Sequence, residues 1–441
     1  MNLENIKNKI ENRTLNIGII GLGYVGLPLA MEFLDKNYKV FGYDISEKKI
    51  NNIKHGRIDY TDVDNDKLST ALLKNFKISS KKQILREIDI AIICVPTPLT
   101  NSFEPDISYI TEAMDTLLSL KLENLIIVLE STTYPGTTRE ILLHNCLNQN
   151  YILDKNLLVA YSPERVDPGN LKFQINNTPK IVGGISQKST YIVEMIYNTI
   201  IEDVIPVSTP EVAEMSKLLE NTFRSVNIAF VNEMMKLSES LNIDIWETLD
   251  ASGTKPFGFM KFLPGPGIGG HCIPLDPMYL YWKGKINNNF SKFIELSHQI
   301  NCKMPEYVVD NIIKFLNINK KSINGSKILL VGMSYKENIS DFRESPSIDI
   351  YELLKKYNAN VDYCDPLISE FNDSHNNTIR SISLNYDLFN HYDIVVLLSV
   401  HEIFDKKLII KNSNYILDTK NAMKEFNNNN TTIKKLGFVN S

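Results

Sequence analysis

The first half of the chain alternates short apolar runs with stretches of helical periodicity. Five runs have the dense apolar pattern of strands buried on both faces, and a helical pattern over residues 27–34 separates the first two. Parallel sheets are built from such strand–helix repeats, because each crossover lays a helix on a sheet face. The pattern predicts a doubly wound parallel sheet with strands at residues 15–20, 38–44, 88–95, 125–130 and 157–161.

The pattern changes after Val204. Thr209 offers a capping hydroxyl, Pro210 suits a first helical turn, and Glu211 complements the helix dipole. The helical periodicity that begins there continues towards Leu241, which is long for a helix of a globular protein. We expect this helix to form a spine between two domains.

A second strand–helix block begins at Ser326. It predicts a helix at 348–357 among strands at 327–331, 361–364, 393–398 and 415–417. The whole chain is therefore expected to be α/β, with two Rossmann-like doubly wound domains joined by a long central helix and a helical middle domain. The expected domain boundaries are 1–205, 206–320 and 321–441, and the middle domain carries the cysteine loop described below.

The composition excludes several classes of protein. The formal net charge of −5 argues against binding to nucleic acid, and no apolar run approaches the length of a membrane span. The first fourteen residues contain no apolar stretch of signal-peptide type, so we expect a polar leader there, and the Asn-rich residues 427–430 predict a solvated tail. The five cysteines are scattered without metal-ligand spacing, so we expect no metal, no disulfide framework and a cytoplasmic setting.

A glycine signature follows the first predicted strand. Gly21, Gly23 and Gly26 fit G-x-G-x-x-G, in which the glycines permit a tight turn, close approach to a pyrophosphate and close helix packing. Asp44 ends the next strand, where a carboxylate accepts from a ribose hydroxyl and repels a ribose phosphate, so NAD is favoured over NADP. Thr97 and Thr132 follow later strands and lie near this cofactor edge or serve as turn residues.

The residues from Pro264 to Cys272 contain four glycines and two prolines directly before a cysteine. Such a rigid bend brings backbone close to a ligand, and a thiol there can form a covalent adduct with a substrate that the nicotinamide oxidises. A buried thiol in an ordinary loop is the alternative. On the predicted long helix, Lys217, Asn221 and Arg224 share one face, which is either a solvated surface or the lining of a cavity in a helix buried on more than one side.

These segments together resemble the UDP-glucose/GDP-mannose dehydrogenase family over nearly the whole chain. The motifs that carry the resemblance are GLGYVGLPLA from Gly21, STTYPGTT from Ser131, YSPER from Tyr161, KLLEN from Lys217, PGPGIGGHC from Pro264 and YKENISDFRESPS from Tyr335. The family oxidises a sugar hydroxymethyl group to a carboxylate in two NAD-dependent steps. The resemblance thus implies NAD as cofactor, a UDP-sugar as substrate and a homodimer or higher homo-oligomer. It also implies an NAD-binding domain at 1–205, a central dimerisation domain at 206–320 and a UDP-sugar-binding domain at 321–441.

The resemblance also implies roles for single residues. Cys272 is similar to the family's nucleophile, which forms a thiohemiacetal and then a thioester. Lys217 and Asn221 match its oxyanion-stabilising pair, Asp276 and Glu164 match its proton-transfer carboxylates, and Thr132 matches a threonine near the reacting water. The implied NAD-binding set is Gly21, Gly23, Tyr24, Val25, Gly26, Asp44, Thr97, Thr132 and Arg343. The implied substrate-binding set is Glu164, Arg165, Lys217, Asn221, Arg224, Phe262, Gly265, Gly267, Gly269, His271 and Lys336.

Two features separate the chain from the UDP-glucose branch of the family. Leu275 stands where that branch has a lysine, and His271 precedes the cysteine. YSPERVDPGN from Tyr161 and TKPFGF from Thr254 resemble enzymes that oxidise UDP-N-acetylglucosamine for bacterial surface polysaccharides. UDP-N-acetylgalactosamine, UDP-N-acetylmannosamine and UDP-glucose stay open as substrates, and a catalytically silent NAD-binding protein is the competing class.

Overall fold

The structure, a computed structural model, describes residues 2–58, 63–100, 102–166, 170, 172–270, 272–426 and 433–438. The chain forms two compact units. The first contains Met1–Glu220 and Met278–Asn289, and the second contains Asn221–Pro277 and Phe290–Ser441. A large sheet lies at the centre of each unit.

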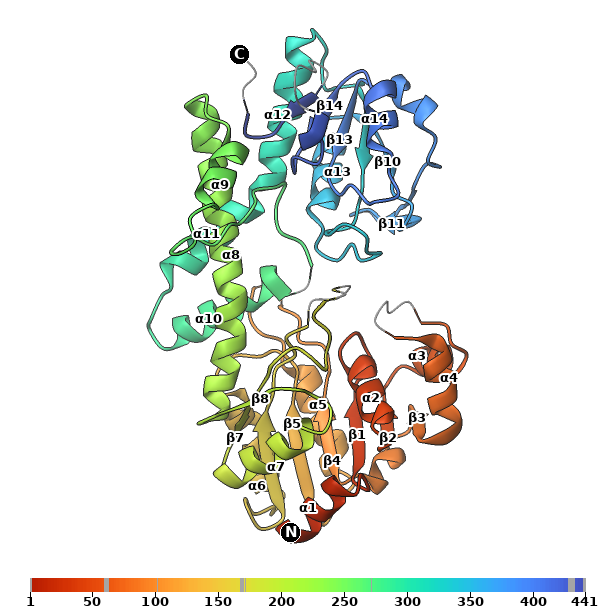
Figure 1. The fold of residues 1–441 in the computed structure, drawn as a ribbon, viewed down its shortest axis with the longest axis vertical. Coiled ribbons are helices and arrows are strands. Elements are labelled where there is room, and N and C mark those ends of the chain that lie inside the picture. Colours follow the sequence, from red (N-terminus) through yellow and green to blue (C-terminus); the bar gives the residue numbers. More distant parts are fainter. Residues whose placement is uncertain are drawn as a thin grey trace. The chain divides into compact units, whose positions relative to one another are not determined.

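The sheet of the first unit has eight strands in the order β3-β2-β1-β4-β5-β6-β7-β8 (Figure 1). Its strands are β1 (Asn16–Ile20), β2 (Lys39–Tyr43), β3 (Phe76–Ser79), β4 (Ile90–Ile93), β5 (Leu125–Leu129), β6 (Leu157–Tyr161), β7 (Lys180–Gly184) and β8 (Val204–Val207). Neighbouring strands are parallel except β6 and β7, where Ala160 pairs with Gly184 in an antiparallel register. The strand order reverses between β1 and β4, which makes their carboxyl ends the switch point where such folds bind ligands.

Helices complete the first unit. They are α1 (Leu3–Glu11), α2 (Gly26–Asp35), α3 (Glu47–Lys54), α4 (Asn65–Lys74), η1 (Lys82–Glu87), α5 (Ser108–Leu118), η2 (Thr138–Leu143), α6 (His144–Asn148) and α7 (Gln187–Tyr197). The expected polar leader is wrong, because residues 3–11 form α1. Asn2 caps this helix, and Ile6 and Ile10, one turn apart, are buried in the core.

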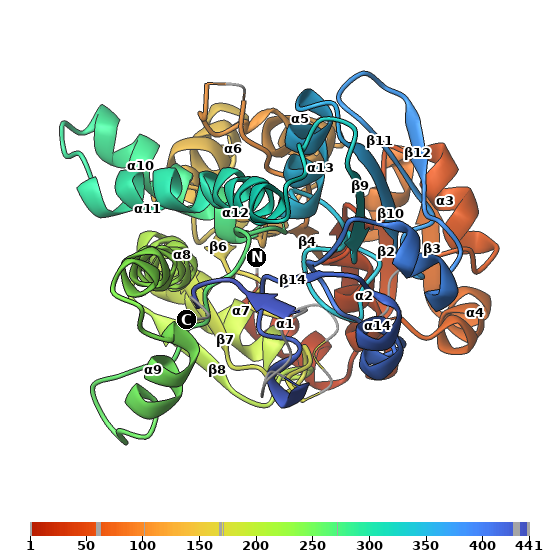
Figure 2. The ribbon, with the colours of Figure 1, turned by 90° about the horizontal axis from the view of Figure 1, so that it is seen from above.

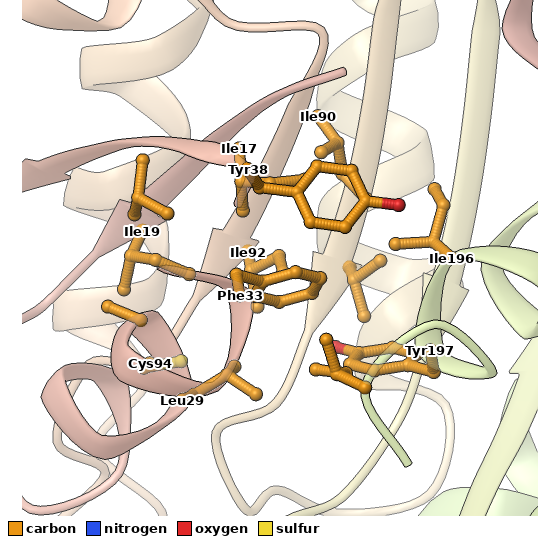
Figure 3. Close-up of a cluster of buried hydrophobic side chains, with 14 of the residues drawn as sticks. Ile17, Ile19, Leu29, Phe33, Tyr38, Ile90, Ile92, Cys94, Ile196 and Tyr197 are labelled. Atoms are coloured by element: carbon orange, nitrogen blue, oxygen red, sulfur yellow. The ribbon is translucent and has the colours of Figure 1, made fainter. Parts of the chain in front are cut away.

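Aromatic rings fix α2 against the sheet. Phe33 of α2 lies 5.7 Å from the ring of Tyr38 and 6.3 Å from that of Tyr197 in α7, measured between centroids. Figure 3 shows these rings beside Ile17 of β1 and Ile92 of β4. Because this packing anchors α2 on β1 and β4, it places the helix N-terminus at the carboxyl edge of the sheet.

Two helices cross the boundary between the units, α8 (Pro210–Ser240) and α10 (Cys272–Ile286). The long central helix predicted from the sequence is thus confirmed. Its predicted cap is also confirmed, since the Thr209 hydroxyl accepts from the backbone N–H of Val212 at 3.3 Å.

The second unit contains a parallel five-stranded sheet in the order β10-β9-β13-β14-β15 and a separate antiparallel hairpin, β11-β12. These strands are β9 (Lys327–Val331), β10 (Asn360–Cys364), β11 (Glu370–Asn372), β12 (Thr378–Arg380), β13 (Ile394–Leu397), β14 (Ile416–Asp418) and β15 (Ile433–Lys435). Its other helices are α9 (Ile245–Ser252), α11 (Lys292–Cys302), α12 (Met304–Ile318), α13 (Pro346–Lys356), η3 (Tyr386–His391), α14 (Lys406–Asn412) and η4 (Lys424–Phe426). Helix α12 packs along α13 (Figure 2).

The α/β class and the two parallel sheets are as the sequence predicts. Every predicted strand is present within two residues of its expected ends, whereas β3, β7, β8, β15 and the hairpin were not predicted. Residues 427–430, expected to be a solvated tail, lie outside the described residues. In the described parts of the chain, no helix combines the length and apolar character needed to cross a bilayer.

Candidate functional site

The three glycines after β1 meet three different surroundings. Gly21 has a φ of +94°, and a Cβ added there would lie 2.5 Å from the carbonyl oxygen of Cys94. A Cβ on Gly26 would lie 1.9 Å from the carbonyl oxygen of Gly21, whereas one on Gly23 would meet nothing within 4 Å. Gly21 thus makes the turn and Gly26 packs α2 closely. Gly23 leaves open space over the backbone beside the α2 N-terminus.

Asp44 ties this turn to the end of β2. Its side chain is 5% exposed, and Oδ2 accepts from the backbone N–H of Leu22 at 3.0 Å while Oδ1 accepts from that of Ser46 at 3.0 Å. Lys49 Nζ lies 2.7 Å from Oδ2. This lysine is therefore held by the Asp44 carboxylate, which speaks against Lys49 as a receptor for a ribose phosphate.

The ends of β4 and β5 lie side by side in this unit. Their register pairs Ile93 with Leu129, and the Ser131 hydroxyl donates to the carbonyl oxygen of Val95 at 2.8 Å. Thr97 is buried, and its carbonyl oxygen accepts from the hydroxyl of Tyr279. Thr132 is half-buried beside them. The two predicted threonines therefore follow neighbouring strands at the edge that holds the glycine turn.

Glu164 and Arg165 follow β6. Glu164 Oε1 accepts from the backbone N–H groups of Arg165 and Val166 at 2.6 and 2.7 Å. The guanidinium of Arg165 pairs with Glu220 of α8 at 2.7 Å and donates to the carbonyl oxygen of Pro179 at 2.8 Å. Arg165, expected in the substrate set, is thus also an anchor between the β6 loop and α8.

The polar stripe on α8 is buried over only part of its length. Lys217 and Asn221, one turn apart, are 8% and 6% exposed, whereas Arg224 is exposed. Leu219 and Phe223 are exposed as well, so the expectation that α8 is buried on more than one side is wrong for that stretch of the chain. A buried lysine and asparagine still mark a polar lining there, because burying such groups costs free energy unless polar partners surround them.

Two of the predicted catalytic residues are hydrogen-bonded to each other within the second unit, and a third, Cys272, lies one helical turn before one of them. Cys272 is exposed at the first position of α10, and Asp276 lies one turn later, on the same face of the helix. The Asp276 carboxylate is 2% exposed and accepts from Asn221 Nδ2 at 2.5 Å. The fold therefore places a buried amide–carboxylate pair next to the thiol-bearing turn. His271 lies outside the described residues.

The glycine-rich loop before Cys272 lies against the C-terminal domain. The backbone N–H of Gly270 donates to the carbonyl oxygen of Arg343 at 3.0 Å. A Cβ on Gly269 would lie 2.5 Å from Tyr335 Cβ, and one on Gly267 would lie 3.0 Å from Pro346. Two motifs far apart in the sequence therefore form one surface, and glycine is needed at 269 because Tyr335 and the carbonyl oxygen of Glu344 leave no room for a Cβ. Phe262 is half-buried near this loop, with its ring packed on that of Phe223.

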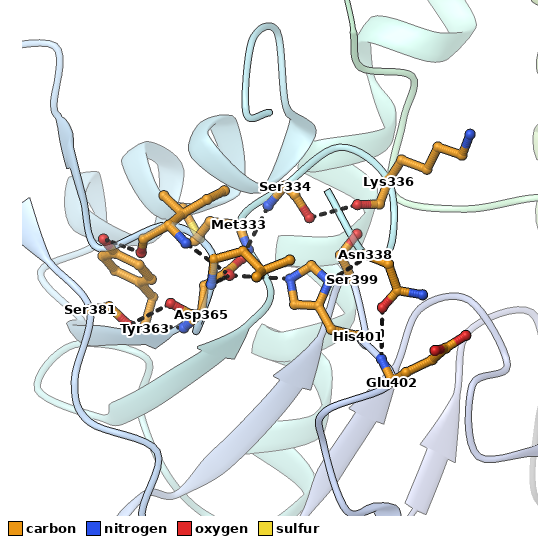
Figure 4. A network of polar contacts seen from close by, with 12 residues as sticks. Met333, Ser334, Lys336, Asn338, Tyr363, Asp365, Ser381, Ser399, His401 and Glu402 are labelled. Atoms are coloured by element: carbon orange, nitrogen blue, oxygen red, sulfur yellow. Dashed lines mark hydrogen bonds and ion pairs between the residues drawn. The ribbon is translucent and has the colours of Figure 1, made fainter. Parts of the chain in front are cut away.

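The segment that carries Lys336 is held by a buried polar network (Figure 4). Asp365 accepts from the backbone N–H of Met333 at 2.6 Å and lies 3.1 Å from His401 Nε2, while His401 Nδ1 accepts from the N–H of Asn338 at 2.8 Å. The His401 proton is therefore on Nε2. The Lys336 side chain points away from this network.

Arg343 is exposed and forms an ion pair with Asp341 at 2.6 Å, within the same segment as Lys336. The structure thus brings both predicted basic residues onto the segment that the glycine-rich loop contacts.

The chain is similar to known proteins over nearly its whole length. Three domains of the UDP-glucose/GDP-mannose dehydrogenase family match it: the NAD binding domain over residues 15–201, the central domain over 211–303 and the UDP binding domain over 329–425. The UDP-N-acetyl-D-mannosamine dehydrogenase of Methanococcus vannielii is 36% identical over 453 aligned residues, which cover 98% of this chain and 96% of that protein. The chain belongs to the UDP-glucose/GDP-mannose dehydrogenase family.

Other relatives agree with this membership. The UDP-N-acetyl-D-glucosamine 6-dehydrogenase of Salmonella typhi is 34% identical, and the alignment covers 88% of this chain and 91% of that protein. The solved structure of a UDP-D-ManNAc dehydrogenase from Pyrococcus horikoshii superimposes with a TM-score of 0.86 at 28% identity, covering 96% of this chain and 99% of that one. The chain is therefore an NAD-dependent oxidoreductase of the nucleotide-sugar dehydrogenase type, with a UDP-binding domain.

The residues of the first unit fit the NAD that the family uses. Gly23 leaves the backbone accessible, and the α2 N-terminus has no side-chain cap, so its N–H groups suit a pyrophosphate. Asp44 stands at the end of β2, where the family's nucleotide domains hold a ribose. Tyr24 and Val25 lie in the same turn, with Tyr24 46% exposed.

Two residues that support segments of the predicted site, Asn232 and Glu214, were missed from the sequence. Asn232 of α8 is fully buried, accepts from the N–H of Gly265 at 2.9 Å and donates to Asn301 at 3.1 Å. Glu214, also buried, accepts from the N–H groups of Gly136 and Thr138 at 2.6 and 2.9 Å. Polar residues inside a helical pattern are usually solvated, so no local signal marked either one.

Proposed function

We propose that the chain oxidises the hydroxymethyl group of UDP-N-acetylglucosamine to a carboxylate, giving UDP-N-acetylglucosaminuronic acid. The motifs YSPERVDPGN and TKPFGF support this substrate. The observation that carries the chemistry is the arrangement of Cys272 one helical turn before the buried Asp276, which holds Asn221. A nucleophile needs such neighbours, because charge develops on oxygen beside it during the reaction.

The proposed reaction uses each residue for one task. NAD, when bound, accepts a hydride in each of the two oxidations. Cys272 attacks the aldehyde from the first oxidation to form a thiohemiacetal, and the second oxidation leaves a thioester. Lys217 and Asn221 stabilise the oxyanion, and Asp276 transfers protons. Water then releases the acid.

Glu164 and Thr132 assist that final hydrolysis in our proposal. Both follow strands whose carboxyl ends lie at the cofactor edge of the first unit, and Glu164 offers a carboxylate held by two backbone N–H groups. Lys336, Arg224 and Phe262, with the glycines of the 264–270 loop, are proposed to bind the UDP-sugar, and Arg343 to reach NAD. The close fit of that loop on the Tyr335–Pro346 segment supports this assignment.

UDP-N-acetylmannosamine is the second candidate substrate. The dehydrogenase from Methanococcus vannielii, whose name carries this sugar, aligns over 98% of the chain, and the Salmonella typhi enzyme over 88%. The two sugars differ in the configuration of one ring carbon, which a few side chains suffice to distinguish.

A substrate panel tests the proposal. NADH formation is followed with UDP-N-acetylglucosamine, UDP-N-acetylmannosamine, UDP-N-acetylgalactosamine and UDP-glucose at equal concentrations. We expect kcat/KM for UDP-N-acetylglucosamine to exceed the others by roughly 10-fold or more, because a site that hydrogen-bonds a polar group of the sugar rejects analogues that lack this group or place it differently. A maximum with UDP-N-acetylmannosamine would transfer the assignment to that sugar. Binding without NADH on any member would favour a catalytically silent NAD-binding protein.

We further propose a cytoplasmic homodimer that serves surface polysaccharide synthesis, with domains at 1–205, 206–320 and 321–441. The reason for the dimer lies on α8, where Phe223, Phe230 and Leu237 recur every seven residues and are exposed. Such a heptad stripe suits packing against a second helix.

A further inference from the structure

A cluster of buried charges lies behind the segment that carries Glu164. Lys180 is the first residue of β7, and Glu130 directly follows β5. Their side chains are 4% and 0% exposed, and Lys180 Nζ lies 3.0 Å from Glu130 Oε2. The hydroxyl of Tyr197 donates to the other carboxylate oxygen of Glu130. Both oxygens of Glu130 are therefore engaged.

The fold alone gives no strong reason for this ion pair. Removing two charges from water costs about as much as their attraction returns, so apolar residues of the same size often stabilise a core equally well. Burial lowers the pKa of Lys180, but the carboxylates of Glu130 and Glu164 outweigh it and raise that pKa. Lys180 is thus held as a cation inside the domain, where its charge acts strongly on its neighbours.

The ammonium of Lys180 also faces Glu164. It lies 3.3 Å from the carbonyl oxygen of Pro163 and 3.9 Å from Glu164 Oε2. Glu164 Oε1 is occupied by two backbone N–H groups, whereas Oε2 is buried and has no hydrogen-bond partner among the described residues. This oxygen is therefore oriented by charge, and its lone pairs remain available to accept a hydrogen bond.

There is room for a water molecule beside these two groups. A hollow with a volume of about 10 Å³ is lined by Glu164 and Lys180 together with Arg165, Ile175 and Thr178. That volume corresponds to a single water, and a water site needs polar partners of the kind these residues supply.

We propose that Lys180 is a positioning residue, whose ammonium orients the Glu164 carboxylate so that Oε2 accepts a proton from the water that hydrolyses the Cys272 thioester. In that step the water oxygen bonds to the thioester carbon. The carbon–sulfur bond breaks, and the sulfur leaves with its electron pair. Glu164 then transfers the proton that it took from water to the sulfur, which restores the thiol of Cys272. The inference rests on the proposed function and deepens it, since Lys180 acts through Glu164 and not on the sugar.

The test compares Lys180→Met with Lys180→Arg, and uses Lys188→Met on α7 as the matched surface control. Because Lys180→Met leaves Glu130 buried without its partner, the double variant Glu130→Gln/Lys180→Met, which removes both charges, is made in parallel. Each variant is mixed with NAD and UDP-N-acetylglucosamine. The NADH burst is recorded, and acid-quenched protein is weighed by mass spectrometry for a sugar adduct on Cys272.

We expect the Met variants to release up to two NADH per active site in a fast first phase. Steady-state kcat should then be at least about 10-fold below the control while the adduct accumulates, since general-base assistance contributes roughly 10²–10⁴-fold. Lys180→Arg should restore most of the rate, because it keeps the charge. Dissociation constants for NAD and UDP-sugar should stay within a factor of about two.

Two outcomes would overturn the inference: Met variants that turn over like Lys188→Met, or variants that are slow without accumulating adduct. The variant Glu164→Gln shows whether the role of Lys180 is wrong or whether the proposed function itself is wrong. If Glu164→Gln accumulates adduct and the Lys180 variants do not, only the role of Lys180 is wrong. If Glu164→Gln accumulates none, the assignment of Glu164 to hydrolysis falls, and the inference falls with it.

Discussion

At the scale of single residues, the glycines after β1 have different roles: one is needed for the fold, and another leaves space for a ligand. Gly26 is needed for packing, because a Cβ there would lie 1.9 Å from the carbonyl oxygen of Gly21. Gly23 has open space around it, so a side chain there would conflict only with a bound ligand. The two positions lie three residues apart in one turn, which makes them matched controls for each other.

We predict opposite effects for alanine at these positions. Gly23→Ala should leave the free energy of unfolding within about 0.5 kcal/mol and raise the dissociation constant for NAD by roughly 10-fold or more, because the methyl group occupies the space of a pyrophosphate. Gly26→Ala should lower the free energy of unfolding by about 1–3 kcal/mol through overpacking. Urea denaturation and NAD titration measure the two quantities. An unchanged NAD affinity in Gly23→Ala would place the cofactor elsewhere.

At the scale of elements, Glu214 joins α8 to the loop after β5. Besides the N–H groups of Gly136 and Thr138, its carboxylate accepts from the Thr138 hydroxyl at 2.7 Å. Burial raises the pKa of Glu214 to about 7, even though these hydrogen bonds act to lower it. The same helix carries Lys217 one turn later, so the contact fixes the loop that contains Thr132 to the helix that bears a proposed catalytic residue.

This raised pKa predicts a dependence of stability on pH. A carboxyl group that binds its proton more tightly in the folded state stabilises the fold fully below the unfolded value of 4.5, and loses this contribution as pH rises through about 7. The loss amounts to about 3 kcal/mol at most, from 1.36 kcal/mol per pKa unit. Glu214→Gln should remove this slope, measured by denaturant unfolding between those two pH values. Glu140→Gln, at an exposed site in η2 directly after that loop, should keep the slope. An equal slope in both variants would contradict the assignment.

The elements of this fold were predictable where one run of residues determines them. The buried strands β1, β4, β5, β6 and β9 are dense apolar runs, and α8 starts at a hydroxyl cap followed by proline. Helix α1 was missed because its apolar face consists of only Leu3, Ile6 and Ile10 among polar residues. Strand β8 was missed because half of it is exposed at the edge of the sheet.

The site was predictable only in its chemistry. The sequence showed a thiol after a glycine-rich bend and a polar stripe on one helix. The contact of Gly269 with Tyr335, the support of the loop by Asn232 and the burial of Lys180 beside Glu130 each join segments tens of residues apart. No local pattern encodes such pairs, because they depend on which strands and helices become neighbours.

At the scale of the whole molecule, the proposed reaction needs an NAD-binding domain and a UDP-binding domain whose ligands both react at one cysteine. Membership of the UDP-glucose/GDP-mannose dehydrogenase family supplies both domains, and the second unit holds Asn221 bonded to Asp276, one helical turn after Cys272. A simple dehydrogenase would remove one hydride and stop at the aldehyde. An enzyme with a nucleophilic thiol continues to the acid, since the thiohemiacetal presents a second hydride.

The stoichiometry of NADH against sugar consumed measures this difference directly. With limiting UDP-N-acetylglucosamine and excess NAD, we predict two NADH for each sugar in the wild type. In Cys272→Ala we predict loss of carboxylate formation with the affinity for UDP-sugar largely kept. One NADH per sugar in the wild type, together with an undiminished rate in Cys272→Ala, would contradict the account and leave an ordinary dehydrogenase with Lys217 as its acid–base group.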